Sequence, residues 1–147
     1  FYRAFVNEKL LRYNFARLDY QNLLVLVPGN FQAQLGLALL NEKDKHYTEA
    51  YDGINSLIEQ YPDSAMAYAA RGGMEKERGM LELAEFDYAK AMELDAGNED
   101  FAFNHVDILI LLGRKDEAYR DLKKLLDAGC QPGRLQGFYA RLKKKKK

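Results

Sequence analysis

Apolar side chains recur along this chain with a fixed period of 34 residues. The first column of the pattern holds only alanine, at Ala16, Ala50, Ala84 and Ala118. The column four residues later holds Tyr20, Ile54, Tyr88 and Leu122, and the column seven residues later holds Leu23, Leu57, Ala91 and Leu125. Residues spaced by four and then three lie on one face of an α-helix. The pattern therefore predicts a stack of helical repeats, an architecture that usually binds other molecules.

Turn and cap signals divide the repeats into pairs of antiparallel helices. In the clearest unit, Asp63 and Ser64 precede the first helix and can cap its amides, and Gly79 can end that helix. Gly113 holds the same place in the next unit. Pro28 and Pro62 each stop a second helix, because proline cannot continue the backbone hydrogen-bond ladder. The first unit is expected to begin inside a helix and to continue to Pro28.

Composition is that of an ordinary soluble domain and excludes few functions. The chain has 147 residues, of which 48% are hydrophobic and 30% charged. It has no apolar run long enough to span a membrane. Its single cysteine, Cys130, excludes an internal disulfide. No signal peptide is visible from Phe1 onward, so the compartment is unassigned: cytoplasmic by default, and periplasmic or secreted if a signal peptide precedes Phe1.

The net charge of zero combines an acidic body with a basic tail. The five lysines of residues 143–147 supply positive charge at the C-terminus, and the rest of the chain is mildly acidic. An acidic body argues against a broad nucleic-acid surface. The tail is expected to be solvated, with electrostatic binding to anionic lipid or nucleic acid as the alternative.

These columns and turns make the sequence similar to the tetratricopeptide repeat (TPR) family. That family has a 34-residue helix–turn–helix unit with the pattern W-x2-L-G-x2-Y…A-x3-F…P. The third unit here reads Tyr68-x2-Arg71-Gly72-x2-Glu75…Ala84-x3-Tyr88…Ala96. The second unit reads Gln34-x2-Leu37-Ala38-x2-Asn41…Ala50-x3-Ile54…Pro62. The chain departs from the pattern in having no tryptophan and in lacking the proline of the last two units.

The resemblance implies an all-α, right-handed superhelical solenoid of antiparallel helix pairs. We expect one array over residues 1–142, with about four repeats at about 1–30, 31–64, 65–98 and 99–132. Leu135, Phe138 and Leu142 follow at helical spacing and predict a capping helix at about 133–142, before the basic tail at 143–147.

In the TPR family the first helices of the repeats line a groove that takes an extended peptide or a partner helix. The matching columns here predict an apolar groove with an acidic end. We name these residues the predicted groove: Tyr2, Phe5, Gln32, Leu35, Leu39, Met66, Ala70, Gly73, Asp100, Phe103, Asn104 and Asp107. The alternative is that some of them, Leu35 and Phe103 above all, pack between adjacent first helices. Gly73 either makes room for a ligand backbone or reflects a tolerant position.

One subset of the family grips the C-terminal carboxylate of heat-shock chaperones with lysine, arginine and asparagine side chains. The matching columns here hold Leu35, Leu39, Ala70 and Asp100, and only Asn104 has the required type. The resemblance therefore does not extend to binding of chaperone tails.

No catalytic, cofactor or metal site is predicted. His46 is expected in a solvated turn, and His105 falls in a column that is usually buried, where it would be a hydrogen-bonded core residue. Asp100, Asn104 and Asp107 share a helical face, but carboxylates on a solvated face are common. No nucleophile constellation and no glycine-rich phosphate loop occurs in the sequence.

The sequence thus favours a non-enzymatic scaffold that binds a protein partner on its concave face. The alternative is a structural segment of a longer repeat protein, or a homo-oligomer that associates through its open first repeat, which begins with apolar residues.

Overall fold

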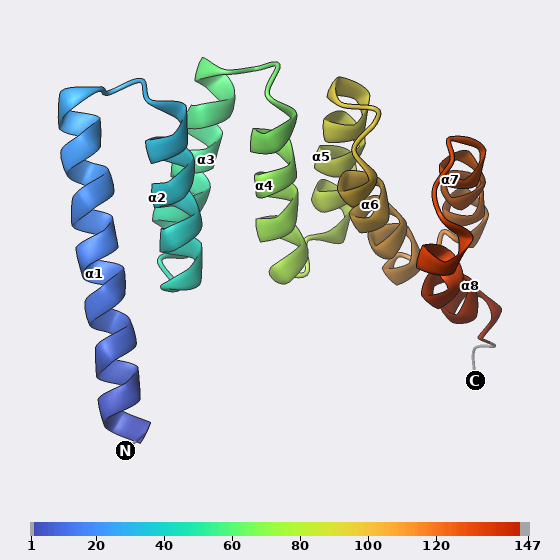
Figure 1. The fold of residues 1–147 in the computed structure, drawn as a ribbon, viewed down its shortest axis with the longest axis horizontal. Helices are drawn as coiled ribbons and strands as arrows, with labels where there is room; N and C mark the ends of the chain where they lie inside the picture. Colours follow the sequence, from blue (N-terminus) through green and yellow to red (C-terminus); the bar gives the residue numbers. More distant parts are fainter. Residues whose placement is uncertain (1, 145–147) are drawn as a thin grey trace. The chain divides into compact units, whose positions relative to one another are not determined.

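In the computed structural model, residues 2–144 are described, with side chains from residue 9 onward, and this part of the chain is helical without any strand. It divides into two compact units, Phe1–Arg71 and Gly72–Lys147, and each is described by itself below (Figure 1). No helix among the described residues has the length and apolar character needed to cross a membrane. The single array predicted over residues 1–142 stays a prediction.

The first unit contains three complete helices and the start of a fourth. Helix α1 spans Tyr2–Leu26, α2 spans Phe31–Lys43 and α3 spans Tyr47–Gln60. Helix α2 packs against both α1 and α3. Helix α4, Ala65–Glu77, begins in this unit and crosses its boundary.

The second unit begins within α4 and is built around α6. Helix α5 spans Leu81–Leu94, α6 spans Glu99–Leu111 and α7 spans Lys115–Asp127. A 3₁₀ turn, η1 at Pro132–Leu135, leads into α8 at Gln136–Lys143. Helix α6 contacts α5, α7 and α8. Helix α8 therefore lies where the sequence predicts a capping helix.

The first helix of each predicted repeat from the second onward is capped by a polar side chain. The Oδ1 of Asn30, the Oγ of Ser64 and the Oδ1 of Asn98 accept hydrogen bonds from the backbone amides three residues later, at 2.8, 3.2 and 3.1 Å. These caps are 34 residues apart, and each satisfies one of the amides that a helix start leaves unpaired. The cap predicted at Ser64 is confirmed.

The turns between paired helices share one backbone conformation. Lys45, Gly79 and Gly113, again 34 residues apart, have φ of 63°, 76° and 78°. This left-handed conformation ends the first helix and reverses the chain. Leu11 holds the same column in the first repeat, and there α1 continues without a turn for 25 residues. The first repeat is therefore one long helix, whereas helix pairs follow in the others.

The periodic columns form the core of each unit. In the first unit Ala50, Ile54 and Leu57 are fully buried. In the second unit Ala84 and Ala91 are fully buried, and the central cluster contains Val106, Ala118, Leu122, Leu135 and Leu142. Alanine in the repeated column allows close approach of neighbouring helices, at about 8–10 Å between axes.

Candidate partner-binding surface

The part of the predicted groove that lies in the first unit is partly open. Gln32, Leu39 and Met66 are exposed, and Met66 has 53% of its surface accessible. Ala70 is half-buried, whereas Leu35 is buried in the core. The structure thus supports the alternative interpretation, in which Leu35 packs between helices. The side chains of Tyr2 and Phe5 lie outside the described residues.

Phe103, in the second unit, is covered by the C-terminal segment. Its ring lies 5.9 Å from the ring of Phe138 on α8, and the Arg134 guanidinium lies 4.7 Å from its centroid. Arg134 also donates to Glu99 at 2.7 Å. Phe103 therefore packs between α6 and α8 more than it faces an open groove. The sequence pattern does not show that the rings of Phe103 and Phe138 meet.

Asp107 holds together three helices of the second unit. It pairs with Lys76 on α4 and accepts a hydrogen bond from Arg141 on α8 at 2.6 Å. Burial raises the pKa of the Asp107 carboxyl, but the hydrogen bonds from Lys76 and Arg141 outweigh it, so the pKa is lower than usual. The predicted acidic end of the groove is thus already neutralised at Asp107 by two cations.

The remaining groove residues of the second unit differ in exposure. Asp100 is exposed, and Asn104 donates to the Asp100 backbone carbonyl at 2.9 Å. Gly73 has a packing neighbour, because a Cβ placed there would lie 3.3 Å from the Tyr88 hydroxyl. A side chain at Gly73 would require the Tyr88 hydroxyl to shift slightly, so close packing favours a small residue there independently of any ligand.

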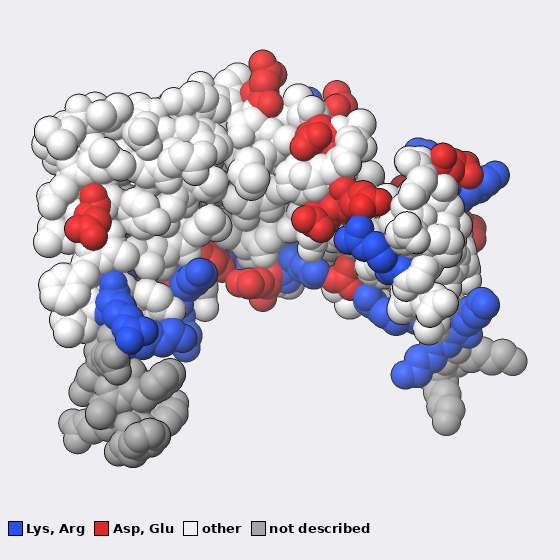
Figure 2. Space-filling view, viewed as in Figure 1, with Lys and Arg blue, Asp and Glu red and all other residues white. Residues whose placement is uncertain are grey.

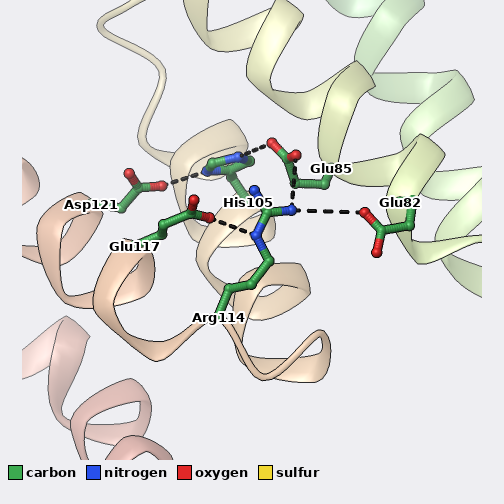
Figure 3. A network of polar contacts seen from close by, with 6 residues as sticks. All are labelled: Glu82, Glu85, His105, Arg114, Glu117 and Asp121. Carbon is green, nitrogen blue, oxygen red and sulfur yellow. Dashed lines mark hydrogen bonds and ion pairs between the residues drawn. The ribbon is translucent and has the colours of Figure 1, made fainter.

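A polar network links α5, α6 and α7 in the same unit (Figure 3). The buried His105 ring contacts Asp121 through Nδ1 and Glu85 through Nε2, the latter at 2.8 Å. Arg114 contacts Glu85 at 3.2 Å and Glu117 at 2.6 Å. Burial lowers the pKa of His105, but its hydrogen bonds to the carboxylates of Asp121 and Glu85 outweigh this effect and raise the pKa. His105 is a hydrogen-bonded core residue, as the sequence predicts.

Two further features of the described residues bear on chemistry: the grouping of possible metal ligands and the position of the one cysteine. Within the described residues, no group of three or more His, Cys, Asp and Glu side chains could hold a metal ion. Cys130 is buried in the core cluster of the second unit with Leu135. Its thiol therefore lies away from the surface.

Comparison with known proteins shows the fold through solved structures. No family model matches the sequence, and no curated protein matches it. A crystal structure of MamA matches with a TM-score of 0.74 at 18% identity, over 92% of this chain and 77% of that one. The MamA fragment 41-end from Desulfovibrio magneticus RS-1 matches with a TM-score of 0.69 at 21% identity, over 82% and 68%.

Two structures described as TPR domains match as well. The first TPR of Spaghetti (RPAP3), bound to an HSP90 peptide, has a TM-score of 0.63 at 23% identity, over 71% of this chain and 83% of that one. The Arabidopsis OM64 TPR domain has a TM-score of 0.66 at 22% identity, over 77% and 93%. The chain therefore has an all-α, TPR-like fold.

Proposed function

We propose that this protein is a non-enzymatic scaffold that binds an extended peptide or an amphipathic helix along the first helices of its repeats. The observation that carries the proposal is the pair Leu39 and Met66, two exposed apolar side chains on α2 and α4 in predicted groove columns of the first unit. Apolar anchors on rigid helices are the usual basis for recognition of an amphipathic segment.

The second unit contributes less apolar surface to this proposal. Phe103 is covered by Arg134 and Phe138, and Asp107 is paired with two cations. We therefore place the main apolar contacts of the partner on Leu39 and Met66 of the first unit.

The chemistry of the groove also separates this protein from one of its structural neighbours. The RPAP3 domain is bound to an HSP90 peptide. Here Leu35, Leu39 and Ala70 stand where a carboxylate-binding groove needs basic and amide side chains. The expected ligand is thus an apolar or amphipathic protein segment instead of an acidic chain terminus.

Site-specific crosslinking tests the proposal. A photoreactive residue at Met66 should capture a partner that the same residue at Glu59, exposed on the second helix α3, does not capture. With the purified partner, Leu39→Glu and Met66→Glu should each lower affinity about tenfold or more. Leu83→Glu, an equally exposed apolar position on α5, is the matched control. Unchanged affinity in folded Leu39→Glu and Met66→Glu would exclude the predicted groove as the binding site.

Self-association is the second candidate function. It is favoured by exposed apolar side chains on α1, which the predicted groove does not include.

A further inference from the structure

Helix α1 has an apolar stripe on the face opposite α2. Leu11, Phe15, Leu18 and Val25 have between 53% and 79% of their surface exposed. The half-buried residues of the described part of α1 fall on the other side, at Tyr13, Ala16, Arg17, Tyr20 and Leu24. Tyr20 faces α2, where its ring occupies the space beside Gly36. Figure 2 shows that the upper surface over α1 and α2 is largely uncharged in this view, whereas basic side chains lie towards the lower end of the described part of α1.

Stacking of repeats does not cover this stripe. The same columns on α3 hold Glu49, Asp52 and Glu59, and these side chains are exposed although α2 packs on α3 as its paired helix. On α7 the columns hold Glu117, Arg120 and Asp127, which are also polar. On α5 two of these columns hold exposed apolar residues, Leu83 and Phe86, and the third holds Glu93. A neighbouring repeat thus leaves this face in solvent. The stripe on α1 is longer than the pair on α5, and an exposed apolar stripe of this length is typical of a contact with another molecule.

The spacing of the stripe matches the seam of a coiled coil. Leu11, Phe15, Leu18, Asn22 and Val25 are separated by four, three, four and three residues, which are the a and d positions of a heptad. Asn22 is the single polar residue of this seam and holds an a position. The continuous α1, about 37 Å long at 1.5 Å per residue, supplies the length that a helix pair needs. The fitting partner is therefore another helix.

We infer that α1 pairs antiparallel with α1 of a second copy of this chain, forming a two-fold symmetric dimer. Phe15 of each copy then lies opposite Leu18 of the other, at the centre of the seam. Arg12 and Asp19, both exposed, flank the stripe in equivalent heptad positions. Antiparallel pairing places Arg12 of one copy beside Asp19 of the other, on both sides of the two-fold axis.

Charge also selects this register over its neighbours. A shift of the seam by one heptad in one direction brings Asp19 beside Asp19, and a shift in the other direction brings Arg12 beside Arg12. Like charges at these positions disfavour the shifted dimers. The proposed register is thus the one in which the flanking charges are complementary while Phe15 and Leu18 meet on both sides of the two-fold axis.

The molar mass of the 147-residue chain, measured by light scattering over a wide concentration range, gives the first test. The mass should rise from 16.9 kDa towards twice that value. Phe15→Glu and Leu18→Glu should each weaken dimerisation about tenfold or more. Leu83→Glu and Phe86→Glu are matched controls, because they alter exposed apolar residues in the same two columns of α5 and should leave the mass unchanged. Circular dichroism establishes that each variant keeps its helix content.

Charge reversal tests orientation and register. Arg12→Asp and Asp19→Arg should each weaken the homodimer, because each variant places like charges side by side across the seam. An equimolar mixture of these two variants should restore dimers, since every pair across the seam is then opposite in sign. A parallel dimer does not gain from mixing, so failure of the mixture to associate overturns the antiparallel arrangement.

Two further outcomes overturn the proposal as a whole. One is a parent chain that stays monomeric at every concentration. This result overturns the proposal even if the parent chain binds a different protein or lipid vesicles and Phe15→Glu abolishes that binding. The other is a dimer that survives Phe15→Glu and Leu18→Glu but is lost in the α5 controls. Met66→Glu should not affect dimerisation, so failure of the groove proposal and failure of this one are distinguishable.

Discussion

Gly72 and Tyr88 are in direct contact, and no side chain fits between them. A Cβ on Gly72 would lie 2.9 Å from two atoms of the Tyr88 ring and 3.4 Å from the Cβ of Asp87. Tyr88 is buried, so its ring has little room to move. Glycine inside a helix costs about 1 kcal/mol relative to alanine. The contact with Tyr88 explains why α4 tolerates this cost.

Gly72→Ala should therefore destabilise the protein despite its better helix propensity. Overpacking in a core costs about 1–3 kcal/mol, which exceeds the gain from alanine. Gly137→Ala in α8 is the matched control, because nothing lies within 4 Å of a Cβ there, and it should be neutral or stabilising by up to about 1 kcal/mol. Denaturant unfolding measures both variants. Equal effects at the two sites would contradict the steric argument.

The alanine column predicts a second steric effect. Ala84 is fully buried, whereas the side chain of Glu82 is 80% exposed on the same helix. Ala84→Leu should lower the free energy of unfolding by about 1–3 kcal/mol, because the larger side chain separates packed helices. Glu82→Leu should change it by less than about 0.5 kcal/mol. Similar unfolding midpoints for the two variants would mean that the repeat register is wrong.

The column of turn residues predicts that substitutions at Lys45 and Gly79 change the stability of the protein in opposite directions. Lys45 has a positive φ of 63°, which costs a side chain about 1–2 kcal/mol, and Gly79 has the same conformation at 76°. Lys45→Gly should therefore stabilise the protein by up to about 1 kcal/mol, after the entropy cost of glycine is included. Gly79→Lys should destabilise it by about 1 kcal/mol. The melting temperatures of the two variants test this prediction, and a loss of stability in Lys45→Gly would contradict it.

Periodicity was enough to predict the helical architecture, because each repeated column has one physical role. Ala50, Ala84 and Ala118 are fully buried where helices approach closely, and Ser64 caps a helix as its side chain allows. The continuous α1 was harder to predict. Leu11 does not favour a left-handed turn, but Lys45 adopts that turn in the next repeat, so residue type alone does not decide between a turn and a helix.

The groove was predicted less completely than the fold, because its state depends on contacts between distant residues. Phe103 and Phe138 are 35 positions apart, and only their packing shows that the ring of Phe103 is covered. Asp107 similarly accepts a hydrogen bond from Arg141, 34 positions later in the sequence, and the repeat pattern does not show this contact. The repeated columns show on which face of a helix a residue lies, but they do not show which distant residue packs against that face.

The buried His105 predicts a pH dependence of stability. Protonated histidine has two N–H donors, so it can donate to Glu85 and Asp121 together. Neutral histidine has one donor, which leaves one carboxylate facing a nitrogen lone pair. The pKa of His105 is higher in the folded protein than its ordinary value of 6.5. A raised pKa means that the stabilisation is complete below pH 6.5 and is lost as the pH rises through the folded-state pKa.

We therefore expect the free energy of unfolding to fall by about 1–2 kcal/mol as the pH rises above this range, because a buried charged group loses a hydrogen bond. His105→Gln, which does not titrate, should be less stable than the parent at pH 6 and should lose most of this pH dependence. The protein has two histidines, so His46→Gln is the matched control and should keep the pH dependence of the parent. Chemical unfolding at several pH values measures all three proteins. A parent whose stability rises between pH 6 and 8, or a His105→Gln variant with the same slope as the parent, would show that His105 is not protonated between the two carboxylates.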